Sequence, residues 1–176
     1  MTTGQMMKWI TSHGGPFICT DKDTADQWSG AGGLSNIAAE KNIESDYNLA
    51  CQVYNYAELL GETIDNVLVI GDLPNEIAWI DIGDGDGAFI KWIGADSEEQ
   101  VLSSIDKLQA LVFTDLPIRF KVNSTQLVAF DSAHRLRELG NNYIEFNLPT
   151  GDYRVSYVNY APDDSLSLNV IRLRRL

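Results

Sequence analysis

Two segments of the sequence carry residues that could do chemistry. The first is His13-Gly14-Gly15, where glycines beside a histidine would suit the oxyanion hole of an esterase-like hydrolase. Such an enzyme also needs a nucleophile elbow, Gly-x-Ser-x-Gly, and this motif is absent from the chain. Because Pro16 follows the two glycines directly, the pattern favours a structural corner at this point.

The second segment is a loop of aspartates and glycines that contains Asp81, Asp84 and Asp86. Carboxylates on a flexible loop are typical ligands of Ca²⁺. An EF-hand loop that starts at Asp84, however, would place Ala88 and Phe89 at positions that require Asp or Asn and then Gly. We therefore predict a solvated hairpin tip and no metal site, because Gly and Asp tolerate the positive φ of tight hairpins.

Other reactive residues are few. His134 follows Asp131 and Ser132, but neighbours in sequence rarely converge on one point as a catalytic triad must. The chain has only two histidines, which argues against a histidine-rich metal centre. Cys19 and Cys51 lack CxxC spacing and are predicted to be buried free thiols. We expect no cofactor and no catalytic residue; the alternatives are an esterase-like hydrolase using His13 or a cation-dependent enzyme using the second segment.

Charge is distributed unevenly along the 176 residues. The chain has 13 basic and 25 acidic residues, a net charge of −12. Residues 1–108 hold 5 basic and 18 acidic residues, whereas residues 109–176 hold 8 and 7. A surface of this sign repels nucleic acids and anionic membranes and favours a basic protein partner, although acidic surfaces also serve solubility alone.

The elements that must position these residues are mostly strands. Alternation of apolar and polar residues predicts strands over 118–122, 143–146, 153–158 and 166–173, and apolar runs predict strands over 66–70, 77–82 and 88–93. The capping box Ser97-Glu98-Glu99-Gln100 predicts a helix, and residues 45–60 predict a short helix that leads into a strand. No period is evident in the polar stretch that ends near residue 44.

The predicted fold class is mainly β, of the α+β kind, with antiparallel sheets in a sandwich-like arrangement and one or two short helices. We expect a single compact domain over 1–176, acidic over 1–108 and β-rich over 109–176. No signal-peptide or membrane-spanning stretch is evident, which predicts a cytosolic protein. Trp9 and Trp28 adjoin turn glycines, so we expect both to anchor structure together with Gly14, Gly15 and Pro16.

Several short blocks, taken in order, resemble the bacterial immunity protein 21 family. The most specific is the opening block from Trp9 to Pro16, with the pattern Trp-x-x-x-x-Gly-Gly-Pro. Later blocks lie at 28–30, 46–51, 68–74 with Trp79, and 92–97, so the resemblance covers residues 9–97. Leu73 departs from the pattern, since the family has an acidic residue there, which weakens any binding role for that turn.

The resemblance implies a mainly β protein, encoded beside a polymorphic toxin, that neutralises the toxin by binding it in the cytosol without catalysis. For the toxin-binding surface we predict the carboxylates of Asp81, Asp84, Asp86 and Asp96 together with Trp92, because a cationic partner would relieve their repulsion and an indole would supply an apolar anchor. The alternative is that the loop is merely solvated and that Trp92 fills the core.

Overall fold

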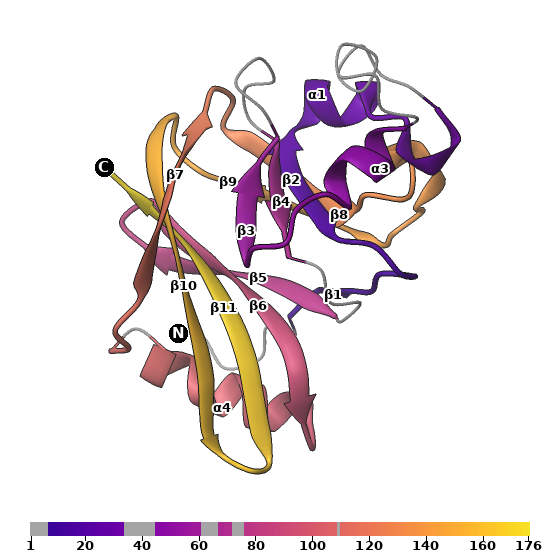
Figure 1. Ribbon diagram of the computed structural model, residues 1–176. Coiled ribbons are helices and arrows are strands. Elements are labelled where there is room, and N and C mark those ends of the chain that lie inside the picture. Colours follow the sequence, from indigo (N-terminus) through magenta and orange to yellow (C-terminus); the bar gives the residue numbers. More distant parts are fainter. Residues whose placement is uncertain (1–6, 34–44, 61–66, 72–75, 109) are drawn as a thin grey trace.

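The computed structural model describes residues 7–33, 45–60, 67–71, 76–108 and 110–176. Leu73 and its turn lie outside these residues, as does Asn66, the first residue of one predicted strand. Within the described part, eleven strands form two antiparallel sheets of six and five strands (Figure 1). The mainly β prediction is confirmed.

The six-stranded sheet has the order β1-β5-β6-β11-β10-β7. Its strands are β1 (Trp9–Ile10), β5 (Ile77–Gly83), β6 (Asp86–Ala95), β11 (Leu166–Arg175), β10 (Gly151–Asp163) and β7 (Thr114–Val122). The five-stranded sheet has the order β3-β4-β2-β8-β9. Its strands are β3 (Ala57–Leu59), β4 (Leu68–Ile70), β2 (Phe17–Asp21), β8 (Gln126–Asp131) and β9 (Tyr143–Asn147). Each sheet combines strands from both parts of the chain, so the charge boundary near residue 108 does not separate the sheets.

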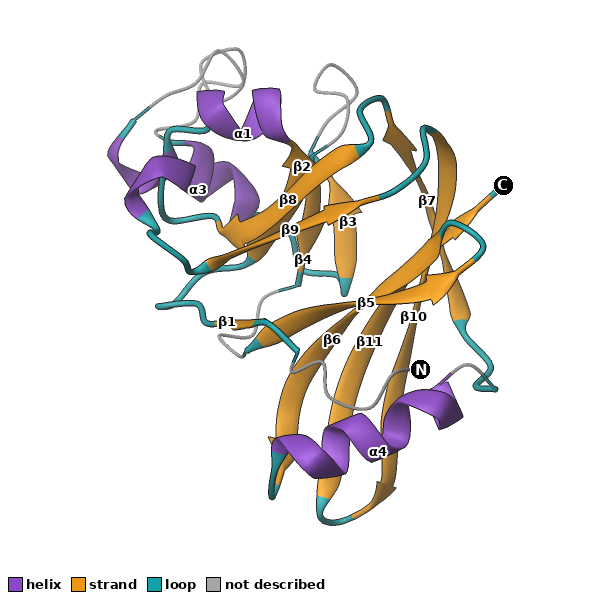
Figure 2. Cartoon of the chain, turned by 180° about the vertical axis from the view of Figure 1, so that it is seen from behind, coloured by secondary structure: helices purple, strands orange, loops and turns teal. Residues whose placement is uncertain are grey.

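The two sheets pack against each other around a shared core that includes Phe17, Phe89 and Tyr153, all fully buried. Helix α4 (Glu98–Leu108) covers the other face of the six-stranded sheet. The outer face of the five-stranded sheet is covered by α1 (Lys22–Gln27) and α3 (Asp46–Ala50). The layers are visible from both sides in Figures 1 and 2, and the sandwich-like prediction is confirmed.

The sheets differ in length. Strands β6 and β11 have 10 residues each and β10 has 13, whereas the longest strand of the five-stranded sheet, β8, has 6. The lower part of the larger sheet therefore extends past the smaller one, and α4 lies on only one of its faces (Figures 1 and 2). No helix in the described residues combines the length and the apolar character needed to cross a membrane.

Local signals explain several elements. The predicted hairpin turns through Asp84 and Gly85, whose φ angles of 56° and 80° are those of a two-residue turn with positive φ at both positions. Helix α4 begins after Ser97, whose hydroxyl accepts a 3.3 Å hydrogen bond from the amide of Gln100. The predicted helix and its cap by Ser97 are therefore confirmed, although the Gln100 side chain accepts its hydrogen bond from the amide of Asp96 and not from that of Ser97.

Three features differ from the predictions. Helix α1 lies in the stretch where the sequence shows no evident period. It buries only Ala25, so it needs no apolar pattern. Asp21 caps the helix and accepts a 2.9 Å hydrogen bond from the amide of Thr24. Strand β10 continues past residue 158, where the predicted strand ends, and contains Pro162. The described residues contain three α-helices, one more than expected, of which only α4 exceeds six residues.

Candidate functional site

The structure divides the five residues predicted to bind a partner into two groups. Asp81, Asp84 and Asp86 lie at the β5–β6 turn, where β6 begins. Trp92 lies six residues further along β6, about 20 Å away along an extended strand, and Asp96 directly follows the strand. The five side chains therefore do not form one continuous patch, and their role in binding stays a prediction.

At the turn, Asp86 is engaged within the fold. Its carboxylate forms a 3.1 Å ion pair with Arg172 and accepts a 2.9 Å hydrogen bond from the main-chain amide of Arg175. The side chain is only 14% exposed. Asp81 and Asp84 are exposed, and the Asp81 carboxylate accepts a hydrogen bond from the amide of Gly83. A partner that reached this turn would therefore meet two carboxylates and not three.

At the other end of β6, Trp92 is half-buried beneath α4. Its ring meets the ring of Trp9 edge-on, with 5.2 Å between the centroids. The indole Nε1 of Trp9 donates a 3.1 Å hydrogen bond to Glu98, the first residue of α4. Both indoles thus help to attach the helix to the sheet, while Asp96 remains exposed beside them.

The Gly14-Gly15-Pro16 corner carries the chain from β1 in one sheet to β2 in the other. Gly14 has a φ of 136°, which disfavours any residue with a side chain. A Cβ on Gly15 would lie 2.4 Å from the ring of Tyr47. Both glycines are therefore explained by conformation and close packing.

Four residues with triad-like chemistry do come together near this corner. The buried Asp131 carboxylate accepts hydrogen bonds from the main-chain amides of His13 (2.8 Å) and Ala133 (2.9 Å). The rings of His13 and His134 meet edge-on at 6.1 Å. The buried hydroxyl of Ser132 has no hydrogen-bond partner, so no nucleophile–base pair forms here.

In the described part of the chain, no observation indicates a metal site or a reactive thiol. No three His, Cys, Asp or Glu side chains lie close enough there to hold a metal ion. Cys19 is a buried free thiol as predicted, but Cys51 is only half-buried because it lies at the end of α3, at the edge of the core. Burial, with a smaller contribution from Asp21, raises the pKa of the Cys19 thiol far above its usual range, which makes it a poor nucleophile.

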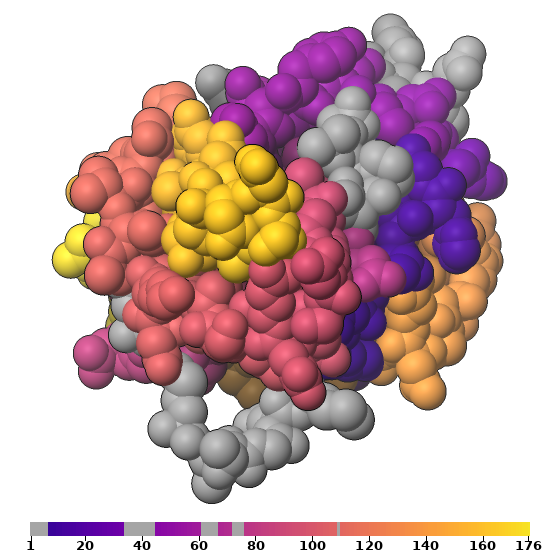
Figure 3. All heavy atoms as spheres, turned by 90° about the horizontal axis from the view of Figure 1, so that it is seen from below, coloured from indigo at the N-terminus to yellow at the C-terminus, as the bar shows by residue number. Residues whose placement is uncertain are grey.

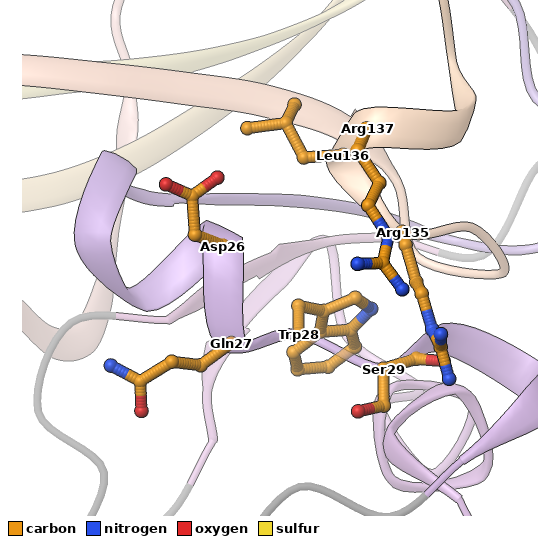
Figure 4. A pocket seen from close by; sticks show the side chains of 7 residues that line it. All are labelled: Asp26, Gln27, Trp28, Ser29, Arg135, Leu136 and Arg137. Atoms are coloured by element: carbon orange, nitrogen blue, oxygen red, sulfur yellow. The ribbon is translucent and has the colours of Figure 1, made fainter.

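A surface pocket of about 230 Å³ lies between the end of α1 and the η2 turn (Leu136–Glu138), as Figure 4 shows. The indole of Trp28 is 2% exposed and donates a 2.8 Å hydrogen bond to the carbonyl of Ser132. Arg135 donates a 3.4 Å hydrogen bond to the carbonyl of Ser29. Two arginines and one aspartate line this pocket, so its charged side chains sum to a positive charge, whereas the chain as a whole is negative.

The sequence patterns did not point to a group of tyrosines that the structure exposes. Tyr54 is 87% exposed and Tyr56 is 40% exposed, in the loop between α3 and β3. Tyr56 stacks on Tyr157 of β10, with 4.0 Å between the ring centroids. No signal of this exposure is present in the local sequence, because the residues that flank the two tyrosines are typical of a partly buried segment: Val53, Ala57 and Leu59.

A family model described as Immunity protein 21 matches residues 8–166. The chain belongs to the immunity protein 21 family. The match extends well beyond the blocks at residues 9–97 and includes α4 and the strands β7 to β10. As a member of the immunity protein 21 family, the chain neutralises a cognate toxin, and proteins of this kind are typically non-catalytic. Searches of curated proteins and of solved structures found no match.

Proposed function

We propose that this immunity protein acts in the cytosol, where it forms a stoichiometric complex with a toxin encoded beside it, and that its acidic surface complements a basic surface of the toxin. The observation that supports this proposal is the imbalance of 18 acidic to 5 basic residues over 1–108, in a chain that belongs to an immunity family. A field of this sign attracts a cationic partner and accelerates the encounter.

In the described part of the chain, carboxylates gather at one end of the molecule, which we call the acidic end: Asp96, Glu99, Asp163 and Asp164 are exposed, and Glu98 is half-buried. Asp96 and the two glutamates lie at the start of α4, and Asp163 and Asp164 lie at the β10–β11 turn. Gln100 joins the two parts through a 2.6 Å hydrogen bond to Ser165. Figure 3 shows the β10–β11 turn in yellow beside the rose-coloured atoms of β6 and α4.

The acidic end suits a basic partner better than the β5–β6 turn does. At the turn, Arg172 neutralises Asp86, and the side chain of Arg175 lies against Gly85 and Gly151. At the acidic end, hydrogen bonds from Ser165 and, to a smaller extent, the charge of Lys107 lower the pKa of Asp163. Of the five predicted residues, Asp96 is the one that belongs to the acidic end.

Coexpression tests this function. The chain and the product of the adjacent reading frame should copurify as a one-to-one complex, and cells that make the toxin domain should survive only when they also make the chain. Recovery of the two proteins separately, with no protection, would overturn the proposal. Protection without a complex would instead indicate that the chain acts on the toxin's target or product.

A further inference from the structure

In part of the six-stranded sheet, a helix covers one face only. Where β6, β10 and β11 extend past the smaller sheet, α4 packs against only one side, to which Val158 and Tyr160 contribute. Because side chains alternate along a strand, Tyr157 and Asn159 lie on the opposite side. Asn169 of β11, which is buried, donates a 2.7 Å hydrogen bond to the exposed Asn159, so this side carries polar groups that are held in place.

The exposed tyrosines lie on the side of the sheet opposite α4. Tyr56 stacks on Tyr157 with an angle of 18° between the rings, and its hydroxyl accepts a 2.8 Å hydrogen bond from Asn159. Tyr54 lies two residues earlier in the same loop and is almost entirely exposed. We call Tyr54, Tyr56, Tyr157 and Asn159 the tyrosine surface.

This arrangement has the properties of a protein-binding surface. Tyrosine is enriched at the energetic centres of interfaces because it offers a large, rigid apolar area together with a hydroxyl, at little cost in side-chain entropy. The stacking on Tyr157 and the hydrogen bond from Asn159 hold Tyr56 in place before any partner arrives. A surface ordered in advance loses less entropy on binding.

The charges around the tyrosine surface indicate the chemistry of the partner. Above it, Glu58 of β3 is half-exposed and accepts a hydrogen bond from Asn55. The turn of β10 and β11, about 20 Å further along the strand from Tyr157, carries Asp163 and Asp164 of the acidic end. Lys91 of β6 is 4% exposed and donates a 3.1 Å hydrogen bond to the carbonyl of Gly71, so its charge is directed into the protein. Aromatic faces suit a guanidinium or ammonium group, and the carboxylates at this distance suit further basic residues of the same partner.

We propose that the tyrosine surface is the centre of the toxin interface and that the toxin places an arginine or lysine side chain there, with its remaining basic residues facing the acidic end. This proposal rests on the proposed function and names the surface through which the complex forms. The partner at this surface is a basic protein and not a second copy of this chain, because two copies would bring like charges together.

Alanine variants test the proposal in the full chain. The probe is the toxin domain from the adjacent reading frame, inactivated so that it can be purified, and the readout is the Kd from titration calorimetry. Tyr54→Ala and Tyr56→Ala together should raise the Kd about 30-fold, as the loss of an interface hot spot does. The control is Val112→Ala, since Val112 is 91% exposed and lies outside the tyrosine surface; its Kd should stay within about twofold of the wild-type value.

The outcomes separate this proposal from the one on which it rests. If the wild-type chain binds the toxin and the double variant binds it equally well, the tyrosine surface is not the interface, although the immunity function stands. If the wild-type chain does not bind the toxin, both proposals fail. If the variant changes only self-association of the chain, measured by sedimentation, the surface joins two copies and the proposal is wrong. The single variant Tyr54→Ala is the control for misfolding, because the Tyr54 side chain is 87% exposed and its loss should not disturb the fold.

Discussion

The indole of Trp28 reaches the carbonyl of Ser132 across 104 residues of sequence, through a hydrogen bond of 2.8 Å. This contact joins the segment after α1 to the end of β8, and the Trp28 ring fills the core layer under α1 and α3. The two sequence blocks at 28–30 and 46–51, which resemble the family, contribute residues to this core layer. Packing in the core therefore accounts for these blocks without a contact to a partner.

Replacement of Trp28 by alanine should lower the free energy of unfolding by about 3 to 5 kcal/mol, because it empties a large buried site and leaves the Ser132 carbonyl without its donor. Urea unfolding followed by circular dichroism measures the change. Trp9 is only half-buried, so Trp9→Ala serves as the comparison and should cost clearly less. Equal costs for the two variants would show that burial does not distinguish their roles.

The two aspartates at the β5–β6 turn should behave differently. Asp86→Asn weakens the ion pair to Arg172 and should destabilise the fold by about 1 to 3 kcal/mol, since charge-assisted hydrogen bonds contribute in this range. Asp84→Asn should change stability by less than about 0.5 kcal/mol, because Asn tolerates the same positive φ and the side chain is exposed. Thermal melts of the single variants measure both effects, and an equally large loss for Asp84→Asn would contradict this assignment.

The two cysteines should differ in reactivity. In the native protein at pH 8, a thiol reagent should modify the half-buried Cys51 and leave Cys19 unmodified until the chain unfolds, which mass spectrometry after a timed reaction can show. Burial raises the pKa of the Cys19 thiol above its usual value of 9.0, so the unfolded chain loses this proton at a lower pH than the native chain does. The stabilising contribution of Cys19 is therefore present below pH 9 and decreases as the pH rises further. Rapid modification of native Cys19 would contradict its burial.

Alternation predicted strands such as 153–158, where Val155 lies in the core shared by the two sheets and Arg154 is exposed, whereas apolar runs predicted strands such as 66–70, where both faces of β4 are buried. Strand ends were harder to predict. Strand β10 continues through Pro162 because an irregularity between Tyr160 and Asp163 accommodates it near the turn. Helix α1 was missed because a helix that buries one alanine leaves no apolar period.

The site was less predictable than the fold, because its contacts join residues distant in sequence. Asp86 and Arg172 lie 86 residues apart, and nothing near Asp86 in the chain indicates that its charge is neutralised. Tyr56 and Tyr157 meet only because β3 lies next to the larger sheet. Residue spacing predicts which side chains share a strand face, but it does not predict which strands become neighbours.

Charge removal should slow the encounter with the toxin more at the acidic end than at the β5–β6 turn. Asp96→Asn with Asp164→Asn should lower the association rate constant about threefold or more at low ionic strength, because exposed charges act mainly on this rate. The double variant Asp81→Asn with Asp84→Asn removes the same amount of charge. Its effect on the association rate constant should be smaller, because Arg172 and Arg175 lie at this turn. Stopped-flow fluorescence measures the two pairs, and a larger effect at the turn would move the binding face there.

The most direct measurement is the association rate constant of the wild-type chain with its toxin domain as a function of salt concentration. We expect a one-to-one complex whose association slows about tenfold or more between low and high salt, since ions screen exposed charges beyond a Debye length of about 8 Å at physiological ionic strength. The dissociation rate constant should change much less. No complex at any salt concentration, or an association rate constant independent of salt, would contradict the claim that an acidic surface captures a basic toxin.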